Sequence, residues 1–457
     1  MKIAFIKPPA TYADWYHRPQ LGAGYLAAYL EEAGHTCRIF DSVFFGWNNA
    51  GLIEQVTEFA PDLAAFTAMT HEIAPAARVA GRLRENSGIV TVVGGCHLSA
   101  LPRETLQEFP TFDFGIAGEG EHGLLGLVKR LQGDIPADCG VPGLVERTPA
   151  GPVAFHAPPP PLTGRELDDL PFPAFHLYYG NNRRALAGPE EEYPIISGRG
   201  CPYRCTFCMQ ALGRVVRHRS AEDICLEMEA AINNFGAHTF NFIDEIFLSD
   251  TPRTRFLLER LISSGLSRRV RWSGLTRANL VNRDLVCLAR RAGCFRLEMG
   301  VESGDDAILR RINKGITVAQ VRAAADCIKA AGIELNTYFI LGHPGETPDS
   351  IDRTRQLAME LNPDNIALGI MVPYPGTEIY RIASRGEGGY RLLSHDWERY
   401  DKYGQGVLEI AGFSHRQLQR EQRRIITSCF LHNGRYLDLF RYAWKRRRAL
   451  YYFLRRS

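Results

Sequence analysis

Residues 194–210 read PIISGRGCPYRCTFCMQ, a short apolar run that leads directly into a loop with three cysteines. A run of this length with turn residues after it is typical of a buried strand. Cys201, Cys205 and Cys208 follow the run with Cys-x3-Cys-x2-Cys spacing. The segment therefore predicts a strand whose carboxyl end carries a metal site, which is where α/β proteins place their chemistry.

The spacing of the three cysteines distinguishes between kinds of metal site. A loop this short can wrap three thiolates around three corners of an iron–sulfur cube, and with no fourth cysteine nearby one iron is left open. A closed zinc site needs four ligands, so His218 would have to complete it. Unrelated core cysteines are a third alternative, which the polar neighbours Arg199, Arg204 and Thr206 disfavour.

After the cysteine loop, apolar runs and helical patterns alternate to about residue 385. The later runs are TFNFID, VRWSGL, FRLEMGV, ELNTYFIL and NIALGIMVP, and the helical segments span 221–235, 252–264, 284–292, 305–312, 318–331 and 348–361. Six such units over about 190 residues fit a partial (β/α)6 barrel better than a second open sheet. The chemistry of such a barrel lies at the carboxyl ends of its strands.

A shorter alternation precedes the loop, from Met1 to about Gln132. Apolar runs such as KIAFI, CRIFD, DLAAFT, IVTVVGG and FDFGIAG are separated by helical patterns. Near-continuous apolar runs are typical of a parallel sheet that is covered on both faces, so we expect a five-stranded, doubly wound domain. The loops after its strands are rich in Gly, aromatic residues and His, and they predict a ligand site. Periodicity does not distinguish among a nucleotide, a flavin and a corrinoid.

Prolines concentrate between these two alternations, with four in a row at 158–161. Such a segment is expected to lack regular structure and to cross the surface as a connector. The predicted organisation is therefore a doubly wound domain at 1–135, a Pro-rich connector at 136–192, a barrel at 193–385 and a helical region at 386–457.

Composition narrows the class of protein. Of the 457 residues, 45% are hydrophobic and 23% are charged, which excludes fibrous, disordered and disulfide-scaffold proteins. The net charge of +3 conceals an asymmetry, because residues 435–457 contain eight Lys or Arg and one Asp. This tail carries +7 and the rest of the chain −4, so nucleic-acid binding by the whole protein is not expected.

The sequence contains no apolar run long enough to span a bilayer, and Lys7 with two prolines interrupts any signal-peptide core. We therefore expect a cytoplasmic protein. The eleven cysteines are then interpreted as thiols or metal ligands rather than disulfides.

The segment GRGCPYRCTFCMQ resembles the motif of radical S-adenosylmethionine (SAM) enzymes, in which three cysteines hold a four-iron four-sulfur cluster and SAM chelates the open iron. With the doubly wound domain in front, residues 1–390 resemble the cobalamin (B12)-binding branch of that superfamily. The segments PQLGAGYLAAYLEEAGHTCRIFD, VVGGCHLSALPRETL and FGIAGEGE carry this second resemblance. It implies a Rossmann-like cobalamin domain, a partial TIM-like radical SAM barrel and a helical C-terminal region.

The resemblance also implies contacts to SAM. Phe207 occupies the position of an aromatic near the adenine, with packing as its alternative. Asp244 or Glu245, after the second barrel strand, would lie near the amino group of SAM or cap the next helix. The other candidates are polar residues in or after later strands, namely Arg277, Glu302, Ser303 and Asn336. A surface salt bridge for Arg277 and a satisfied strand amide for Asn336 are equally compatible with the sequence.

The cobalamin domain departs from the Asp-x-His-x-x-Gly motif of other cobalamin proteins. Asp14 and His17 are three apart but lack the glycine. The resemblance therefore implies base-off cobalamin without a protein histidine ligand. Candidate cobalamin-lining residues share a position in the loops after the strands, and they are Tyr12, His17, Thr70, His71, Gly94, Gly95, His97, Gly118, Glu119 and Gly120.

The resemblance implies that a reduced cluster cleaves SAM to methionine and a 5'-deoxyadenosyl radical, which abstracts hydrogen from an unactivated carbon. Methyl transfer from methylcobalamin is the main hypothesis, with the two carboxyl-end faces opposed and the substrate between them. Oxidative cyclisation or another rearrangement of a tetrapyrrole or lipid-like small molecule is the alternative. A non-catalytic corrinoid sensor with a structural cluster is a hypothesis of another class. An electron donor such as flavodoxin or ferredoxin is implied, and no catalytic acid or base is assigned.

The C-terminal tail follows a helical stretch at 414–431 and mixes aromatic residues with arginines. Trp444, Tyr451, Tyr452 and Phe453 fit an interfacial helix on anionic lipid. They fit equally a terminal helix that docks its aromatic side chains on the barrel and exposes a basic face. No RNA-binding motif accompanies them. The tail therefore predicts either peripheral membrane contact or simple docking.

Overall fold

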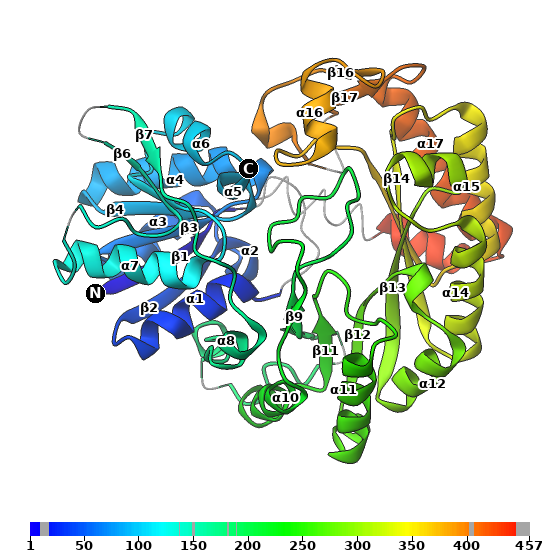
Figure 1. Cartoon of the computed structure of the whole chain (residues 1–457), viewed down its shortest axis with the longest axis horizontal. Helices are drawn as coiled ribbons and strands as arrows, with labels where there is room; N and C mark the ends of the chain where they lie inside the picture. Colours follow the sequence, from blue (N-terminus) through cyan, green and yellow to red (C-terminus); the bar gives the residue numbers. More distant parts are fainter. Residues whose placement is uncertain are drawn as a thin grey trace.

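The computed structural model describes residues 1–9, 18–136, 138–148, 151–180, 182–188, 190–401 and 406–444. Two α/β units lie side by side, the first in blue to cyan and the second in green to yellow (Figure 1). The C-terminal region, in orange and red, covers one end of the second unit and reaches back toward the first (Figure 1). The predicted fold class is confirmed.

The first unit is built on a seven-stranded sheet. Its strands, in spatial order, are β2 (Thr36–Asp41), β1 (Lys2–Lys7), β3 (Leu63–Thr67), β4 (Val90–Gly94), β5 (Phe114–Ile116), β6 (Leu144–Arg147) and β7 (Val153–Phe155). The first five are parallel, as the sequence predicts, and the last two run antiparallel to their neighbours.

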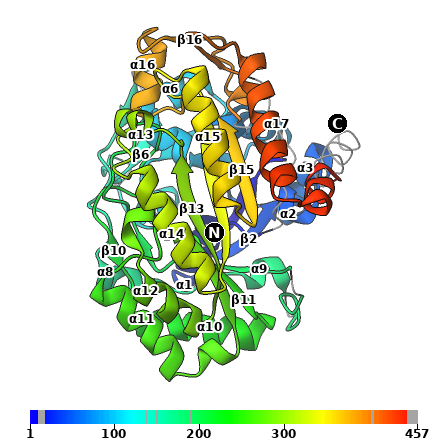
Figure 2. The same cartoon turned by 90° about the vertical axis from the view of Figure 1, so that its right-hand side faces the viewer.

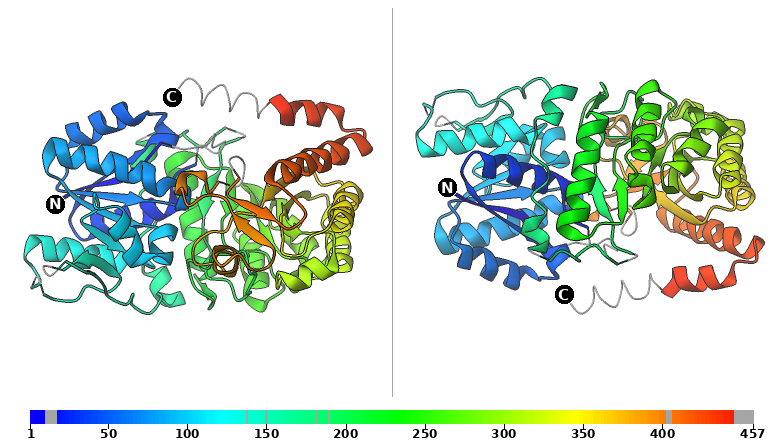
Figure 3. Two further views of the ribbon diagram at one scale, coloured as in Figure 1. Left: turned by 90° about the horizontal axis from the view of Figure 1, so that it is seen from above. Right: turned by 90° about the horizontal axis from the view of Figure 1, so that it is seen from below.

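Helices cover both faces of this sheet (Figure 3). They are α1 (Leu21–Glu32), α2 (Ser42–Phe45), α3 (Asn49–Phe59), α4 (Ile73–Ser87), α5 (Cys96–Ala100), α6 (Pro102–Glu108) and α7 (Gly120–Gln132), with the 3-10 turn η1 (Thr70–Glu72). α1 packs with α7, and α3 packs with α4. Helix ends follow local chemistry: Asn48 caps α3 by accepting from the N–H of Gly51, and α4 ends at Gly88, whose φ is 64°.

The Pro-rich segment contributes more regular structure than predicted. β6 and β7 come from within it and extend the first sheet beyond the five predicted strands. The segment also forms α8 (Gly164–Asp168) and α9 (His176–Tyr179). Prolines tolerate this arrangement because they flank the two strands rather than interrupt them. The domain boundary near residue 135 stays a prediction.

The second unit is built on six strands whose neighbours all run parallel. Its strands, in order, are β8 (Tyr193–Ile195), β11 (Thr239–Phe242), β12 (Arg271–Thr276), β13 (Cys294–Glu302), β14 (Glu334–Leu341) and β15 (Asn365–Ile370). The outer helices are α10 (Ala221–Phe235), α11 (Pro252–Ser263), α12 (Arg283–Arg291), α13 (Asp306–Arg311), α14 (Val318–Ala330) and α15 (Pro348–Leu361) (Figure 2). The sheet follows chain order with β8 and β15 at its two ends, which is the predicted partial (β/α)6 barrel.

Shorter elements complete the second unit and the C-terminal region. They are β9 (Gly198–Arg199), β10 (Arg217–His218), η2 (Leu266–Arg268), η3 (Ala278–Leu280), α16 (Glu378–Ser384), β16 (Tyr390–Leu392), η4 (Trp397–Arg399), β17 (Leu408–Ile410) and α17 (His415–His432), and residues 436–444 are also helical. In the described ranges, no helix combines the length and apolar character that crossing a bilayer requires.

The carboxyl ends of the two sheets face each other. Ala100 ends the helix that follows β4, Met209 follows the last cysteine of the cysteine loop, and Gly376 lies after β15. A Cβ at Gly376 would lie 3.2 Å from the Cβ of Ala100 and 3.7 Å from the Cγ of Met209. Loops from both units therefore meet at the edge where each sheet is expected to bind its ligand.

Candidate active site

The cysteine loop is closed by a short antiparallel ladder. β9 pairs with β10, so residues 200–216 project as a loop from the carboxyl end of β8. Gly200 has a φ of 100°, and a Cβ there would lie 2.3 Å from the carbonyl oxygen of Val215. Only glycine permits this approach of the two limbs. The N–H of Cys201 donates to the carbonyl of Gly213 at 3.1 Å, which holds the first cysteine against the second limb.

The three cysteine thiols remain accessible in this loop. Cys201 and Cys205 are half-buried, and Cys208 is exposed. The N–H of Cys208 donates to the carbonyl of Cys205 at 3.1 Å, a turn that brings these two residues together. Partial burial raises the pKa of Cys201, and the charge of Cys205 adds to the shift. Cysteines bind a metal centre as thiolates, so all three would lose their protons on binding one.

The geometry favours an iron–sulfur cluster over a single zinc ion. Within the described residues, no three His, Cys, Asp or Glu side chains form a group that could hold one metal ion. His218 lies in β10, outside the cysteine loop, and its side chain is exposed. A closed zinc site needs a fourth protein ligand, whereas a four-iron cluster can be held by three thiolates of one short loop. The three cysteines therefore fit a cluster with one open iron.

Arg277 lies directly behind the cysteine loop. Its side chain is buried, and its Nη1 lies 3.9 Å from the Sγ of Cys205. The guanidinium carbon is 3.8 Å from the ring centroid of Tyr203, and Nε donates to Asn279 at 3.0 Å. Nη2 is buried and has no hydrogen-bond partner among the described residues. Nη2 is therefore placed to donate to the carboxylate predicted from the sequence. The rest of the guanidinium contacts the cysteine loop.

The two carboxylates after β11 have different surroundings. Asp244 is buried and accepts hydrogen bonds from the N–H of Ser197 at 2.9 Å and from its hydroxyl at 2.7 Å. Burial raises the pKa of Asp244 to about 6, and these hydrogen bonds offset part of the rise. Glu245 is half-buried, and its charge raises the pKa of Cys201. Glu245 is thus the carboxylate beside the cluster loop, whereas Asp244 holds the end of β8.

The strand β13 ends in a strained residue. Glu302 has a φ of 68°, and its Oε1 lies 2.6 Å from the Nζ of Lys314 in a buried ion pair. Positive φ at a non-glycine residue is concentrated at functional sites. Ser303 is fully buried, with its hydroxyl 3.3 Å from that of Thr354 and accepting from the N–H of Asp305 at 3.2 Å. Ser303 therefore fixes the loop after β13. Lys314 was not predicted, because nothing in RINKGIT distinguishes it from a surface lysine.

Phe207 lies in the cysteine loop and contacts the loop after β14. Its ring centroid is 6.1 Å from that of His343, and the Nζ of Lys314 is 5.9 Å from the same ring. His343 is fully buried, and burial lowers its pKa to about 4, so this side chain is neutral. Asn336 is buried in β14, in register with Glu298 of β13. Phe207 thus has packing contacts at the predicted adenine position.

The loops after β3 and β4 form the edge of the first sheet. Thr70 and His71 are buried in η1, while Gly94 and Gly95 are half-buried. Gly95 has a φ of 101°, and a Cβ there would lie 2.7 Å from the carbonyl oxygen of Ala68. Glycine is therefore required for the close approach of the two loops.

His97, in α5, is covered by the C-terminal region. It is 1% exposed, its two ring nitrogens have no hydrogen-bond partner in the described part of the chain, and burial lowers its pKa to about 4. Its ring centroid lies 5.0 Å from that of Trp397, whose indole N–H donates to Glu108 at 2.9 Å. Two further candidates, Tyr12 and His17, lie outside the described residues.

The glycine-rich segment before α7 is directed at the second unit. Gly118 is exposed with a φ of 84°, and Gly120 begins α7. The Oε1 of Glu119 lies 2.6 Å from Arg217, and its Oε2 lies 3.4 Å from Arg199. The carboxylate predicted to line the cobalamin site is therefore paired with two arginines of the barrel.

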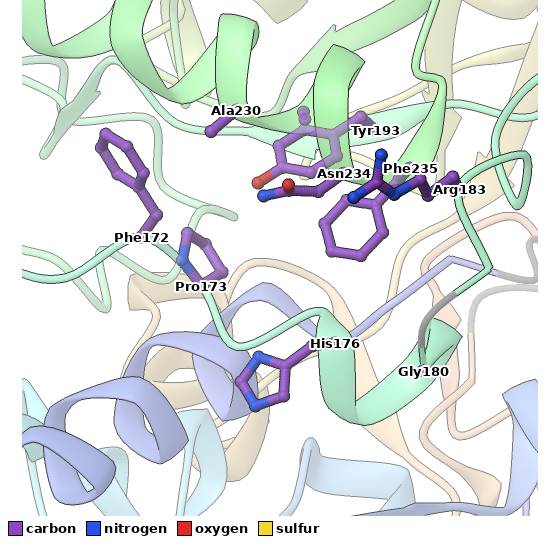
Figure 4. Close-up of a pocket in the computed structure, with 10 residues that line it drawn as sticks. Phe172, Pro173, His176, Gly180, Arg183, Tyr193, Ala230, Asn234 and Phe235 are labelled. Atoms are coloured by element: carbon purple, nitrogen blue, oxygen red, sulfur yellow. The ribbon is translucent and has the colours of Figure 1, made fainter.

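A cavity of about 440 Å³ lies apart from these loops, between the connector and α10 (Figure 4). Its walls include Phe172, Pro173, His176, Arg183, Asn234 and Phe235. Tyr193, also in the wall, begins β8, whereas the cysteine loop follows the carboxyl end of that strand. The hydroxyl of Tyr193 donates to Glu227 at 3.1 Å. The Nε2 of His176 lies 3.3 Å from the Oε2 of Glu31. The cavity is therefore separate from the site at the facing edges.

Comparison with known proteins identifies both units. Residues 16–128 match the B12 binding domain, and residues 195–358 match the radical SAM superfamily. The uncharacterized methyltransferase PH0819 of Pyrococcus horikoshii is 29% identical over 440 residues, covering 94% of this chain and 93% of the relative. The anaerobic magnesium-protoporphyrin IX monomethyl ester cyclase of Rubrivivax gelatinosus is 30% identical over 422 residues, covering 88% of this chain and 72% of the cyclase. The chain belongs to the cobalamin-binding branch of the radical SAM superfamily.

The fold of this radical SAM protein agrees with a solved structure. TsrM from Kitasatospora setae, a radical SAM methyltransferase solved with cobalamin and a [4Fe-4S] cluster bound, superposes with a TM-score of 0.74 at 18% identity. The match covers 93% of this chain and 90% of TsrM. The similarity extends through both units and into the C-terminal region.

Membership in the family confirms the predicted class of enzyme and its cofactors, namely a four-iron four-sulfur cluster, SAM and cobalamin. The residues of this chain fit the cluster, because three accessible thiols share one loop after β8. The facing edge of the first unit offers the place for cobalamin. Roles of individual residues toward SAM and cobalamin stay predictions.

Proposed function

We propose that this enzyme transfers a methyl group from cobalamin to an unactivated carbon of a small molecule. The contact among Ala100, Met209 and Gly376 carries the proposal, because it brings the edges of both cofactor units together. When bound, the cluster supplies one electron to SAM, the adenosyl fragment removes a hydrogen atom from the substrate, and cobalamin supplies the methyl group. The chain itself binds and orients these groups and excludes water between the two edges.

Side chains around the cysteine loop suit this task. We assign the binding of SAM to Phe207, Glu245 and Glu302, which lie in or beside the loops after β8, β11 and β13. Lys314 neutralises Glu302 across 2.6 Å and keeps the strained end of β13 in one conformation. Arg277 offers its unpartnered N–H to an anionic group of SAM.

A reaction that needs no substrate tests the proposal. Anaerobically reconstituted enzyme with reduced cobalamin is incubated with SAM deuterated in its methyl group. We expect S-adenosylhomocysteine and deuterated methyl on cobalamin, because a methyltransferase must reload cobalamin from SAM. Formation of 5'-deoxyadenosine without labelled cobalamin would reject methyl transfer.

That second outcome would favour a cyclase-type reaction on a tetrapyrrole. The 30% identity to the Rubrivivax gelatinosus enzyme supports this second candidate, since the radical-forming residues would serve either reaction. A lipid-like substrate is the further alternative, which labelled product analysis would distinguish.

The reductant is proposed to be an acidic one-electron carrier such as flavodoxin or ferredoxin. Arg204 and Arg214 are exposed on the cysteine loop, and Arg214 donates to the carbonyl of Tyr203 at 3.4 Å. Two exposed cations beside the cluster site would attract an acidic partner to the position from which an electron has the shortest path.

Peripheral contact with an anionic membrane is proposed for the end of the chain. Residues 436–444 are helical, and Leu439 and Tyr442 pack toward the core. Three large apolar side chains on another face stay 74%, 65% and 49% exposed, namely Leu437, Phe440 and Trp444. The sequence continues with KRRR. An exposed apolar stripe followed by cations is what the surface of an anionic bilayer binds.

A further inference from the structure

Two arginines at the base of the cysteine loop form ion pairs with the first unit. Arg199 in β9 places its Nη2 2.7 Å from Oε1 of Glu121 and its Nη1 3.4 Å from Oε2 of Glu119. Arg217 in β10 places its Nη2 2.6 Å from Oε1 of Glu119. Glu121 lies in the first turn of α7, and Glu119 is the residue before that helix. These four side chains are called the interdomain clamp below.

The clamp is almost wholly removed from solvent. The two arginine side chains are each 8% exposed, and those of Glu119 and Glu121 are 10% and 5% exposed. Two positive and two negative charges balance within the clamp. Removing one partner would leave an uncompensated buried charge, which destabilises far more than the loss of a surface pair. The clamp therefore favours one arrangement of the two units.

The clamp holds both limbs of the cysteine loop. Arg199 precedes Cys201 by two residues, and Arg217 lies where the loop returns. The connector adds a third attachment, because the N–H of Leu162 donates to Glu119 at 3.1 Å and its carbonyl accepts from Arg217 at 2.9 Å. A shift of the segment before α7 would therefore move the loop that carries the cluster ligands.

We propose that Glu119 and Glu121 are positioning residues that set the separation between cobalamin and SAM by fixing the cysteine loop against the first unit. Cleavage of SAM involves the cysteine loop and the barrel, which belong to one unit. Transfer of the methyl group from SAM to reduced cobalamin joins groups held by different units, and a misplacement of about 1 Å can cost on the order of a hundredfold in such a reaction. The catalytic consequence rests on the proposed function, whereas the mechanical role of the clamp does not.

Neutralising one carboxylate tests this role in the reconstituted holoenzyme. E121Q and E119Q keep the size of the side chain and remove its charge. We expect faster amide hydrogen exchange across residues 198–218, by about tenfold, with no change in β13. S-adenosylhomocysteine formation should fall at least about tenfold, and by more than 5'-deoxyadenosine formation, so that the ratio of the two products falls.

The matched control is E398Q. Glu398 pairs with Arg78 and joins the same first unit to the C-terminal region, but these side chains are 34% and 58% exposed. A surface pair contributes little, so both readouts should stay at wild-type values. Wild-type exchange and an unchanged ratio of the two products in E119Q and E121Q would overturn the proposal.

A second variant covers the case in which a lone buried arginine prevents folding. R199M/E121M removes both charges, a replacement that buried pairs often tolerate. We expect this variant to fold and to bind its cofactors. It should show the same faster hydrogen exchange and the same change in product ratio, because an apolar contact does not fix the orientation of the cysteine loop as an ion pair does. Wild-type behaviour would overturn the proposal. If wild-type enzyme forms no S-adenosylhomocysteine, the proposed function fails, while hydrogen exchange still tests the clamp.

Discussion

The Nη1 of Arg277 lies 3.9 Å from the Sγ of Cys205. The rest of the guanidinium is held by the ring of Tyr203 at 3.8 Å and by Asn279. A cation that donates an N–H to a cluster ligand stabilises the more negative, reduced form of the cluster. This contact is therefore suited to raise the reduction potential of the cluster.

Replacing Arg277 by methionine should make the midpoint potential of the cluster more negative and slow SAM cleavage. Arg277→Lys keeps the charge without the planar fork and should fall between wild type and R277M. A redox titration monitored by electron paramagnetic resonance measures the potential. Arg283 is an exposed arginine at the start of α12 and provides the control R283M. An unchanged potential in R277M would show that the contact does not reach the cluster.

Charge reversal on the cysteine loop should separate two sources of electrons. In R204E/R214E we expect slower 5'-deoxyadenosine formation with flavodoxin as donor, because an acidic partner would be repelled. The rate with dithionite should stay at the wild-type value, since this small reductant does not need a docking surface. Equal losses with both donors would instead indicate damage to the loop, and equal rates would remove these arginines from the docking site.

Both sheets were predictable because their strands are buried on two faces. Ile3, Phe5 and Ile6 in β1 are all buried, so the strand appears in the sequence as a continuous apolar run. β7 escaped prediction because it is three residues long and lies at the edge of its sheet near prolines. The position of the three cysteines in one loop after β8 was predictable because their spacing is local information, and their role as cluster ligands stays a prediction.

Side-chain partners were not predictable, because they depend on which distant segments the fold brings together. Arg217 pairs with Glu119 of the first unit, whereas Arg219, two residues later, pairs with Glu227 of α10. The adjacent Asp244 and Glu245 differ in the same way, one bound to Ser197 and the other beside Cys201. Only the three-dimensional arrangement distinguishes an interdomain ion pair from a ligand contact.

Removing two residues of the exposed apolar stripe should weaken membrane binding if the tail contacts lipid. We expect L437S/F440S to pellet less than wild type with vesicles of phosphatidylcholine and phosphatidylglycerol, because each side chain loses its apolar contact with the bilayer. Phe256 on α11 is 53% exposed and supplies the control F256S. Equal pelleting of all three proteins would contradict membrane contact through this helix.

Glu346 is a buried carboxylate in the loop after β14. The N–H of Gly342 donates to its Oε2 at 2.6 Å, and its Oε1 has no hydrogen-bond partner among the described residues. Burial raises the pKa of Glu346 to about 8. The carboxyl group is therefore protonated in the folded protein at neutral pH and ionised in the unfolded chain.

The stability of the protein should consequently depend on pH through Glu346. Its pKa is higher in the folded state, about 8 against an ordinary 4.5, so the folded state binds the extra proton and loses stability as pH rises between these values. The slope approaches roughly 1.4 kcal/mol per pH unit. The amide that E346Q introduces cannot titrate. The thermal midpoint of E346Q minus that of wild type, both measured without the cluster, should therefore increase as pH rises toward about 8. The control E360Q alters an exposed carboxylate paired with Arg322. The difference in thermal midpoint between E360Q and wild type should not change with pH. A flat difference in E346Q as well would mean that the folded protein ionises Glu346 at its ordinary pKa.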